Sequence, residues 1–242
     1  MQSLVSPLRA SLLLLILQLL LVESAAADGS RYISVTAVDL TELLPPPPAK
    51  GSAAARQDLD AVLRAQAART PDSMAAAKAD ALVSVFRFAD VLGPAFTSNR
   101  LPRTAALFRI VGRDATAIGG RAKDYWQRPR PYRFSDRVTS ILDETTGDSY
   151  PSGHAMYGCM TAVLLGVMVP EQRAALLERG TTYAQNRVVA GVHYPTDVEA
   201  GCTGGKIVAA VLLQSPVFQG DLAAARDETR QALGLGNLAR KN

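Results

Sequence analysis

Apolar residues recur at helical spacing along most of the chain after residue 50. Leu59, Val62, Leu63 and Ala67 follow one another at i, i+3, i+4 and i+8, and the stretch 101–118 repeats this spacing towards Trp126. No alternating strand pattern of any length and no internal repeat is found. The pattern predicts an all-α fold, a single-domain bundle of about six or seven helices.

Proline, glycine and apolar runs give approximate bounds for the other helices. Thr70-Pro71 opens one helix, with proline at its first position, and we expect it to run to Gly93-Pro94. Residues 155–169 are apolar on nearly all sides, which predicts a buried central helix. Further helices are expected over 171–189 and 195–213, with a last amphipathic helix near 222–233.

The first 27 residues have the pattern of a secretory signal peptide. An apolar run over 12–22 is interrupted only by Gln18, and small residues in an Ala-x-Ala pattern predict cleavage after Ala27. A membrane anchor is the weaker alternative, because the run is shorter than the roughly 20 residues that a span needs. We therefore expect an exported, periplasmic protein with no membrane span after signal cleavage.

Residues 28–50 predict an extended arm that precedes the helical domain, 51–242. The arm ends in "LLPPPPAK", and four consecutive prolines preclude a helix and favour polyproline geometry. Nothing before this segment could form a second core, so the arm is expected to lie across the surface of the domain.

Composition indicates a globular chain rather than a disordered one. It has 242 residues, of which 48% are hydrophobic and 20% charged. The formal net charge is +4, and basic residues alternate with acidic ones, so no nucleic-acid binding is expected. Cys159 and Cys202 form either one disulfide or two buried free thiols, and their number alone leaves both open.

The two histidines, His154 and His193, both lie in polar, turn-rich contexts. "YPSGH" precedes the central apolar run and by itself could be a turn with a serine helix cap. Asp197 follows His193 by four residues and could accept the imidazole Nδ1–H, leaving Nε2 as nucleophile or base. Alone, the same aspartate could simply begin a helix.

A third segment, "KDYWQRPRP", brings Lys123, Arg128 and Arg130 together around prolines. Arginine offers planar paired donors and lysine a point charge, as a phosphate site requires. By itself this stretch could equally be a basic surface loop.

Taken together, the three segments resemble the tripartite signature of the type 2 phosphatidic acid phosphatase superfamily, which also contains the vanadium haloperoxidases. The signal peptide, the Leu-Leu-Pro-Pro-Pro-Pro arm and the tyrosine before PSGH are similar to class A bacterial nonspecific acid phosphatases. Asn186 and Ala155 depart from that pattern, which usually has serine and threonine there. The matching residues are Lys123-x6-Arg130-Pro131, Pro151-Ser152-Gly153-His154 and Arg187-x5-His193-x3-Asp197.

The resemblance implies a role for each matching residue in the hydrolysis of a phosphate monoester. His193 would attack phosphorus through Nε2 to form a phosphohistidine, with Asp197 orienting its ring. His154 would protonate the leaving group and then activate water. The phosphoryl oxygens would be bound by Lys123, Arg130, Ser152, Gly153 and Arg187, while Arg128 supports the cluster.

The resemblance also implies small phosphomonoesters and inorganic phosphate as ligands, and it allows a homo-oligomer. We expect no metal or other cofactor, because three nearby cations would repel a divalent ion. Three alternatives remain: a vanadate-dependent haloperoxidase, a non-catalytic phosphate-binding protein, and a lipid phosphatase as a variant of the main hypothesis.

The cysteines occupy matched positions relative to these motifs. Cys159 follows His154 by five residues, and Cys202 follows Asp197 by five. If both helices start at the site and run side by side, both thiols lie about 7.5 Å along their axes. That depth favours a Cys159–Cys202 disulfide, whereas antiparallel helices would exclude it.

Overall fold

The computed structural model describes residues 30–236, so the predicted signal peptide lies outside the described residues. Within them the fold is all-α, without strands, and seven helices have nine or more residues, which confirms the predicted class. The elements are α2 (Leu40–Leu43), α3 (Ala53–Ala67), α4 (Pro71–Ala79), η1 (Val85–Phe88), α5 (Ala89–Leu92), α6 (Pro102–Trp126), α7 (Pro131–Phe134), α8 (Gly153–Met168), η2 (Pro170–Gln172), α9 (Arg173–Val189), α10 (Pro195–Leu212) and α11 (Pro216–Ala232).

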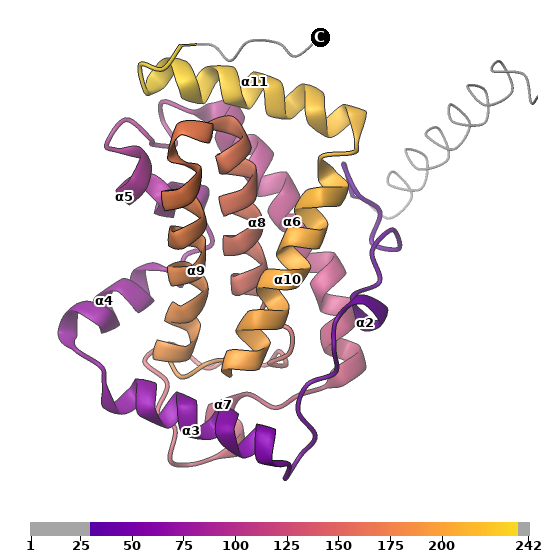
Figure 1. The fold of residues 1–242 in the computed structure, drawn as a ribbon, viewed down its shortest axis with the longest axis vertical. Coiled ribbons are helices and arrows are strands. Elements are labelled where there is room, and N and C mark those ends of the chain that lie inside the picture. The colour runs from indigo at the N-terminus through magenta and orange to yellow at the C-terminus, as the bar shows by residue number, and fades with distance from the viewer. Residues whose placement is uncertain (1–29, 237–242) are drawn as a thin grey trace, which may run out of the picture.

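Helix α8 forms the centre of the bundle, as its apolar sequence predicts. Twelve of its residues are buried, and α9 and α10 pack along it while α6 adds a third neighbour. Helix α11 lies across one end of the bundle, and α3 lies across the other (Figure 1).

Glycines allow α9 and α10 to approach α8 closely. A Cβ on Gly205 of α10 would overlap the Met156 carbonyl oxygen, and one on Gly201 would overlap the Ser152 carbonyl oxygen. On the other side, a Cβ on Gly180 of α9 would lie 3.1 Å from the Gly158 carbonyl oxygen. The three helices are therefore held in contact along their backbones.

The single helix predicted from Thr70-Pro71 to Gly93 is wrong, because the chain leaves helical geometry at Asp80. Helix α4 ends at Ala79, and only the 3₁₀ turn η1 and the short α5 follow. The buried Asp80 carboxylate binds Arg179 of α9, and the next carbonyl, that of Ala81, contacts His154. These tertiary contacts outweigh the local helical propensity of the alanine-rich sequence.

Other boundaries differ by smaller amounts. Helix α11 begins at Pro216, capped by Ser215, rather than near residue 222. Helix α6 extends to Trp126 and therefore includes Lys123, and Gln127 ends it in a left-handed conformation with φ 48°. The short α2 and α7 were not predicted, since neither is long enough to show a periodic pattern.

The described part of the N-terminal arm, residues 30–50, contributes to the core as well as lying along the bundle (Figure 1). Tyr32, Ile33 and Leu40 are buried in the main hydrophobic cluster. The Tyr150 hydroxyl donates to the carbonyl of Pro45, where the proline run begins. The arm is thus fastened to the domain both at its start and at its prolines.

A membrane-spanning helix has requirements of length and apolar character. No single helix in residues 30–236 meets them; α10 and α11 do so only as a pair, bent by 98°.

Candidate functional site

The predicted site residues meet where several helices end. The N-termini of α8 and α10 lie at the same end of the bundle as the C-terminus of α9 (Figure 1). Backbone hydrogen bonds join the intervening loops: Ser149 N–H donates to the Arg128 carbonyl at 2.8 Å, and Ser152 N–H donates to the Asp197 carbonyl at 2.9 Å. The loops therefore bring residues from positions 123–197 to one end of the fold.

His193 is buried and held between Asp197 and Arg130. Its Nδ1 lies 3.3 Å from Asp197 Oδ2, and its Nε2 lies 3.0 Å from Arg130 Nη1. A guanidinium can only donate, so Nε2 is the accepting nitrogen and Nδ1 carries the hydrogen. Burial, together with the charges of Arg130 and Lys123, lowers the pKa of His193 well below its usual range.

Asp197 is fully buried, and most of its acceptor capacity is used. Besides His193, its Oδ2 accepts from the Tyr194 N–H at 2.9 Å and from the Ser149 hydroxyl at 2.5 Å. Burial raises the pKa of the Asp197 carboxyl, while Arg128 and the Ser149 hydrogen bond oppose that rise. Ser149 also lies 3.3 Å from His193 Nδ1, a contact that the sequence motifs did not predict.

Arg128 contacts carboxylates rather than facing the other cations. Its Nη1 donates to Asp197 Oδ1 at 2.6 Å, and its Nη2 donates to Asp58 Oδ2 at 2.7 Å. Its guanidinium also lies over the ring of Tyr194, 3.9 Å from the centroid. Arg128 therefore supports the site by fixing Asp197, and Asp58 of α3 gave no local signal of this role.

Lys123 and Arg130 are oriented by carbonyls of the loop before α8. Lys123 Nζ donates to the Asp148 carbonyl at 2.5 Å, and Arg130 Nε donates to the Gly147 carbonyl at 2.8 Å. Burial and the nearby Arg130 lower the pKa of Lys123 to about 8. Burial also lowers the pKa of Arg130, which stays charged near neutral pH.

Arg187 is the cation of the site whose hydrogen bonding says most about the ligand. It is buried, and its Nε and Nη1 have no hydrogen-bond partner. Burial lowers its pKa to about 10, and the charge of Arg130 acts in the same direction. A buried guanidinium with unpaired N–H groups is costly unless it binds an anion, so this geometry fits an oxyanion ligand.

Ser152 and Gly153 form the entrance of α8. The buried Ser152 caps the helix, its hydroxyl accepting from the Ala155 N–H at 3.3 Å. A Cβ on Gly153 would meet no atom within 4 Å, so the first turn borders open space. Free N–H groups and the helix dipole favour an anion at such a position.

His154 follows Gly153, and its ring contacts the non-helical segment after α4. Its Nε2 lies 3.0 Å from the Ala81 carbonyl oxygen, which can only accept, so Nε2 carries a hydrogen. Burial and the charge of Arg187 lower the pKa of His154 to about 4. Among the described residues, no three His, Cys, Asp or Glu side chains are grouped as a metal ion would require.

The two departures from the family pattern contact neighbouring parts of the fold, the turn after α4 and helix α10. Asn186 is buried and donates to Asp80 Oδ2 at 2.8 Å. Ala155 is fully buried and faces Gly201 of α10, where an added Cβ would lie 3.0 Å from the alanine methyl.

Cys159 and Cys202 are joined by a disulfide, with Cα atoms 5.1 Å apart. They lie on α8 and α10, both of which begin at the site and run side by side (Figure 1). The bond therefore links the helix that carries His154 to the helix that carries Asp197.

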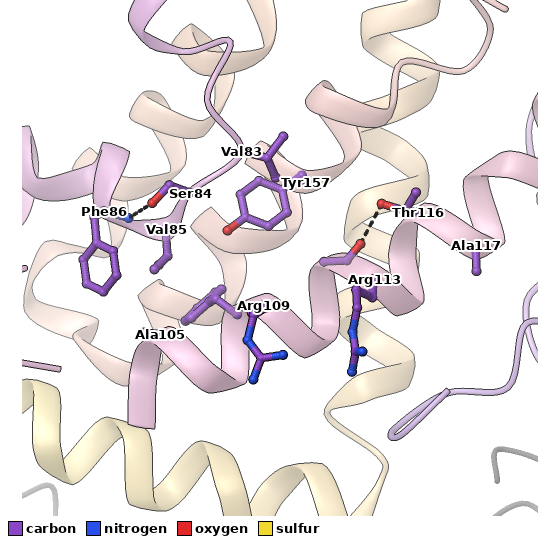
Figure 2. A pocket seen from close by; sticks show the side chains of 12 residues that line it. Val83, Ser84, Val85, Phe86, Ala105, Arg109, Arg113, Thr116, Ala117 and Tyr157 are labelled. Carbon is purple, nitrogen blue, oxygen red and sulfur yellow. Dashed lines mark hydrogen bonds between the residues drawn. The ribbon is translucent and has the colours of Figure 1, made fainter. Parts of the chain in front are cut away.

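A separate apolar pocket of about 690 Å³ lies between η1, α6 and α8. Figure 2 shows Tyr157 inside it and the guanidinium groups of Arg109 and Arg113 pointing away from that ring. None of the predicted site residues lines this pocket, so we assign it no chemical step.

Comparison with known proteins places these observations in a family. The sequence profile of the PAP2 superfamily matches residues 105–221. A non-specific acid phosphatase of Salmonella typhimurium is 34% identical over 194 residues, which cover 76% of this chain and 78% of the relative. An acid phosphatase of Zymomonas mobilis is 31% identical over 197 residues, covering 78% and 75% respectively.

Among solved structures, a transmembrane PAP2 type phosphatidylglycerolphosphate phosphatase from Bacillus subtilis has a similar fold. The TM-score is 0.50 at 17% identity, covering 67% of this chain and 86% of the other. At this identity the similarity concerns the fold alone.

Proposed function

The chain belongs to the PAP2 superfamily, and we propose that it is an acid phosphatase that hydrolyses phosphate monoesters through a phosphohistidine on His193. The observation that carries this proposal is a buried Arg187 with unpaired N–H groups in the same site as His193, whose Nε2 accepts a hydrogen bond. Mere phosphate binding would need the cations but no oriented histidine. The names of the curated relatives do not favour the haloperoxidase alternative.

In the first step, His193 Nε2 attacks phosphorus in line while the bond to the ester oxygen breaks. Asp197 holds the Nδ1–H and stabilises the positive charge that develops on the ring. His154 gives its proton to the leaving alkoxide. In the second step, His154 takes a proton from water, which attacks phosphorus and releases phosphate and free His193.

The cations act on the charge of the phosphoryl oxygens. Lys123, Arg130 and Arg187 are preorganised by the loop carbonyls and by burial, so they need little rearrangement in the transition state. Ser152 and the N-terminus of α8 add a hydroxyl and N–H groups.

Substrate binding should also favour the protonation of His154. Burial and the cations hold its pKa at about 4, so the free ring is neutral at pH 6. A bound oxyanion offsets those positive charges and raises the pKa of His154. Activity in mildly acidic solution follows from this coupling.

We further propose that the protein is exported to the periplasm after cleavage at Ala27. The Cys159–Cys202 disulfide supports this location, because disulfides persist in oxidising compartments.

The proposal is tested by hydrolysis of p-nitrophenyl phosphate, with and without EDTA, by wild type and His193→Ala. We expect the variant to lose at least about several hundredfold in kcat, since nucleophile and intermediate both disappear, and EDTA to have no effect. A near-normal rate in a variant that unfolds like wild type would refute the mechanism. Inactivation by EDTA would instead indicate a metal site.

His154→Ala separates the two steps. p-Nitrophenolate leaves without a proton, so this variant should still release one burst of p-nitrophenol and then accumulate phosphohistidine. Mass spectrometry after a rapid alkaline quench should locate the phosphate on His193. Absence of both the burst and the modified histidine would contradict the assigned roles.

A further inference from the structure

Three consecutive residues after α4, Asp80 to Leu82, are each bound to the central helices through a different group. The Asp80 side chain binds Arg179 and Asn186 of α9. The Ala81 carbonyl accepts from His154 Nε2, and the Leu82 carbonyl accepts from the Tyr183 hydroxyl at 3.0 Å. We call residues 80–82 the brace turn.

The Asp80 carboxylate is the fixed point of this turn. It is 1% exposed and accepts hydrogen bonds on both oxygens. Oδ1 accepts from Arg179 Nη2 at 2.6 Å and Arg87 Nε at 3.0 Å, and Oδ2 accepts from Arg179 Nη1 at 2.9 Å and Asn186 Nδ2 at 2.8 Å. The two paired bonds to Arg179 set the orientation of the carboxylate as well as its position.

The donors on α9 form one stripe of that helix. Arg179, Tyr183 and Asn186 follow one another at intervals of four and three residues, which places them on the same face. The next residue is Arg187, the buried cation of the site. The brace turn is therefore fastened to α9 immediately beside the phosphate-binding cations.

Apolar packing contributes little to holding this turn. Leu82 and Val83 are 64% and 51% exposed, respectively. The polar contacts of Asp80 and the Leu82 carbonyl are thus what keeps the Ala81 carbonyl against His154.

We propose that Asp80 is a positioning residue for His154: it holds the brace turn so that the Ala81 carbonyl accepts Nε2–H and leaves Nδ1 to give and take the catalytic proton. This inference rests on the proposed function. In the neutral ring Nδ1 then has a free lone pair, which takes a proton from water, and in the charged ring Nδ1–H protonates the leaving oxygen. Asn186, which departs from the family pattern, takes part by completing the Asp80 contacts.

Other charged groups also act on His154 and must be kept in any test. Arg187 of α9, Arg130 before α7 and Lys123 of α6 all disfavour its charged form. None of them donates a hydrogen bond to Asp80, so substitutions at Asp80 leave their hydrogen bonds in place and remove only the electrostatic effect of the Asp80 charge on Arg187.

The test is Asp80→Asn, with Asp90→Asn as the matched control. Asp90 also binds Arg179, at 2.5 Å, but its side chain is 54% exposed and does not adjoin the Ala81 carbonyl. With an alkyl phosphate, whose leaving group needs a proton, we expect kcat of Asp80→Asn to fall by up to about 100-fold with little change in KM. The burst of p-nitrophenol from p-nitrophenyl phosphate should keep its wild-type rate, and Asp90→Asn should match wild type in both assays.

Nitrogen-15 spectra of the histidine side chains give a readout that a merely structural role would not move. Wild type should show protonated Nε2 and bare Nδ1 in His154 at pH 7, and Asp80→Asn should show a mixture of both tautomers. An unchanged tautomer together with unchanged kcat on the alkyl phosphate would overturn the inference.

Tyr183→Phe provides a second variant if Asp80→Asn does not fold. It removes the donor to the Leu82 carbonyl alone and should change the tautomer and the alkyl phosphate rate in the same direction, to a smaller extent. No change in either would also overturn the inference. If the proposed function itself were wrong, His193→Ala would instead keep full activity.

Discussion

At the scale of single residues, Arg128 supplies the counter-charge for two buried carboxylates of the site. It is 9% exposed and binds Asp58 and Asp197 with separate nitrogens. Truncating it leaves two buried carboxylates without their counter-charge. We expect Arg128→Ala to lower the free energy of unfolding by about 3–5 kcal/mol, measured by urea denaturation.

Arg226→Ala is the matched control for this prediction. Arg226 pairs with Asp227 at 3.2 Å on α11, where the carboxylate side chain is 57% exposed. Exposed pairs contribute little, so the control should change the unfolding free energy by less than about 1 kcal/mol. Equal effects of the two substitutions would show that Arg128 does not neutralise the buried carboxylates.

The residue scale also separates what the sequence can predict from what it cannot. Asp197 lies four residues after His193, so their contact follows from local spacing and was expected. Asp58 precedes Asp197 by 139 positions, and only the fold brings them to one arginine. Arg128 was expected only to support the cation cluster, and its two carboxylate partners could not be predicted because they are distant in sequence.

At the scale of elements, the contact between α8 and α10 depends on glycines. Gly205 faces the Met156 carbonyl so closely that a methyl group must push the two helices apart. We expect Gly205→Ala to destabilise the protein by about 1–3 kcal/mol. It should also lower kcat, because α8 carries His154 and α10 carries Asp197.

Gly220→Ala, on α11, is the corresponding control. A Cβ at Gly220 would meet no atom within 4 Å, so the substitution only changes helix propensity. It should stabilise the protein by up to about 1 kcal/mol without altering kcat. Thermal unfolding and p-nitrophenyl phosphate hydrolysis on both variants would check this; a stabilised, fully active Gly205→Ala would contradict the packing argument.

Element prediction succeeded where apolar periodicity and burial agree. The central helix and its two neighbours lie within a few residues of the predicted bounds, since their apolar faces are the packed faces. The prediction for the stretch after α4 failed because its alanine-rich sequence is compatible with a helix whether or not the chain turns there. The turn is caused by Asp80, whose partners Arg179 and Asn186 lie about a hundred residues later.

At the scale of the whole molecule, the disulfide joins residues 43 positions apart and closes a loop that contains α9 and three predicted site residues, Arg187, His193 and Asp197. Cys159→Ser with Cys202→Ser should lower the free energy of unfolding by about 2–4 kcal/mol, chiefly by freeing the unfolded chain. Activity at 25 °C should persist, because the close contact of α8 with α10 does not depend on the bond.

Urea unfolding of wild type with and without reductant measures the same quantity independently. Reduced wild type should match the double variant. If reductant leaves the midpoint of the oxidised protein unchanged while free-thiol assays show full reduction, the predicted stabilisation is wrong.

The two histidines contribute to the dependence of stability on pH. Burial and the surrounding cations lower the pKa of His154 to about 4 and also hold that of His193 well below its usual range, whereas both are near 6.5 in an unfolded chain. Below pH 6.5 the unfolded state therefore binds more protons than the folded state. The contribution of the histidines to stability should be fully present above that pH. It should decline as the pH falls, by up to about 1.4 kcal/mol per pH unit for each histidine.

Binding of an oxyanion should restore part of the stability that is lost at low pH. Sulfate keeps its charge between pH 5 and 7, and when bound beside Arg187 it would raise the pKa of His154 towards its ordinary value. Sulfate should therefore raise the Tm more at pH 5 than at pH 7, because its binding takes up a proton. In His154→Gln the difference between the two pH values should disappear while binding through the cations remains. A sulfate effect that is equal at both pH values in wild type would show that His154 does not couple proton uptake to anion binding.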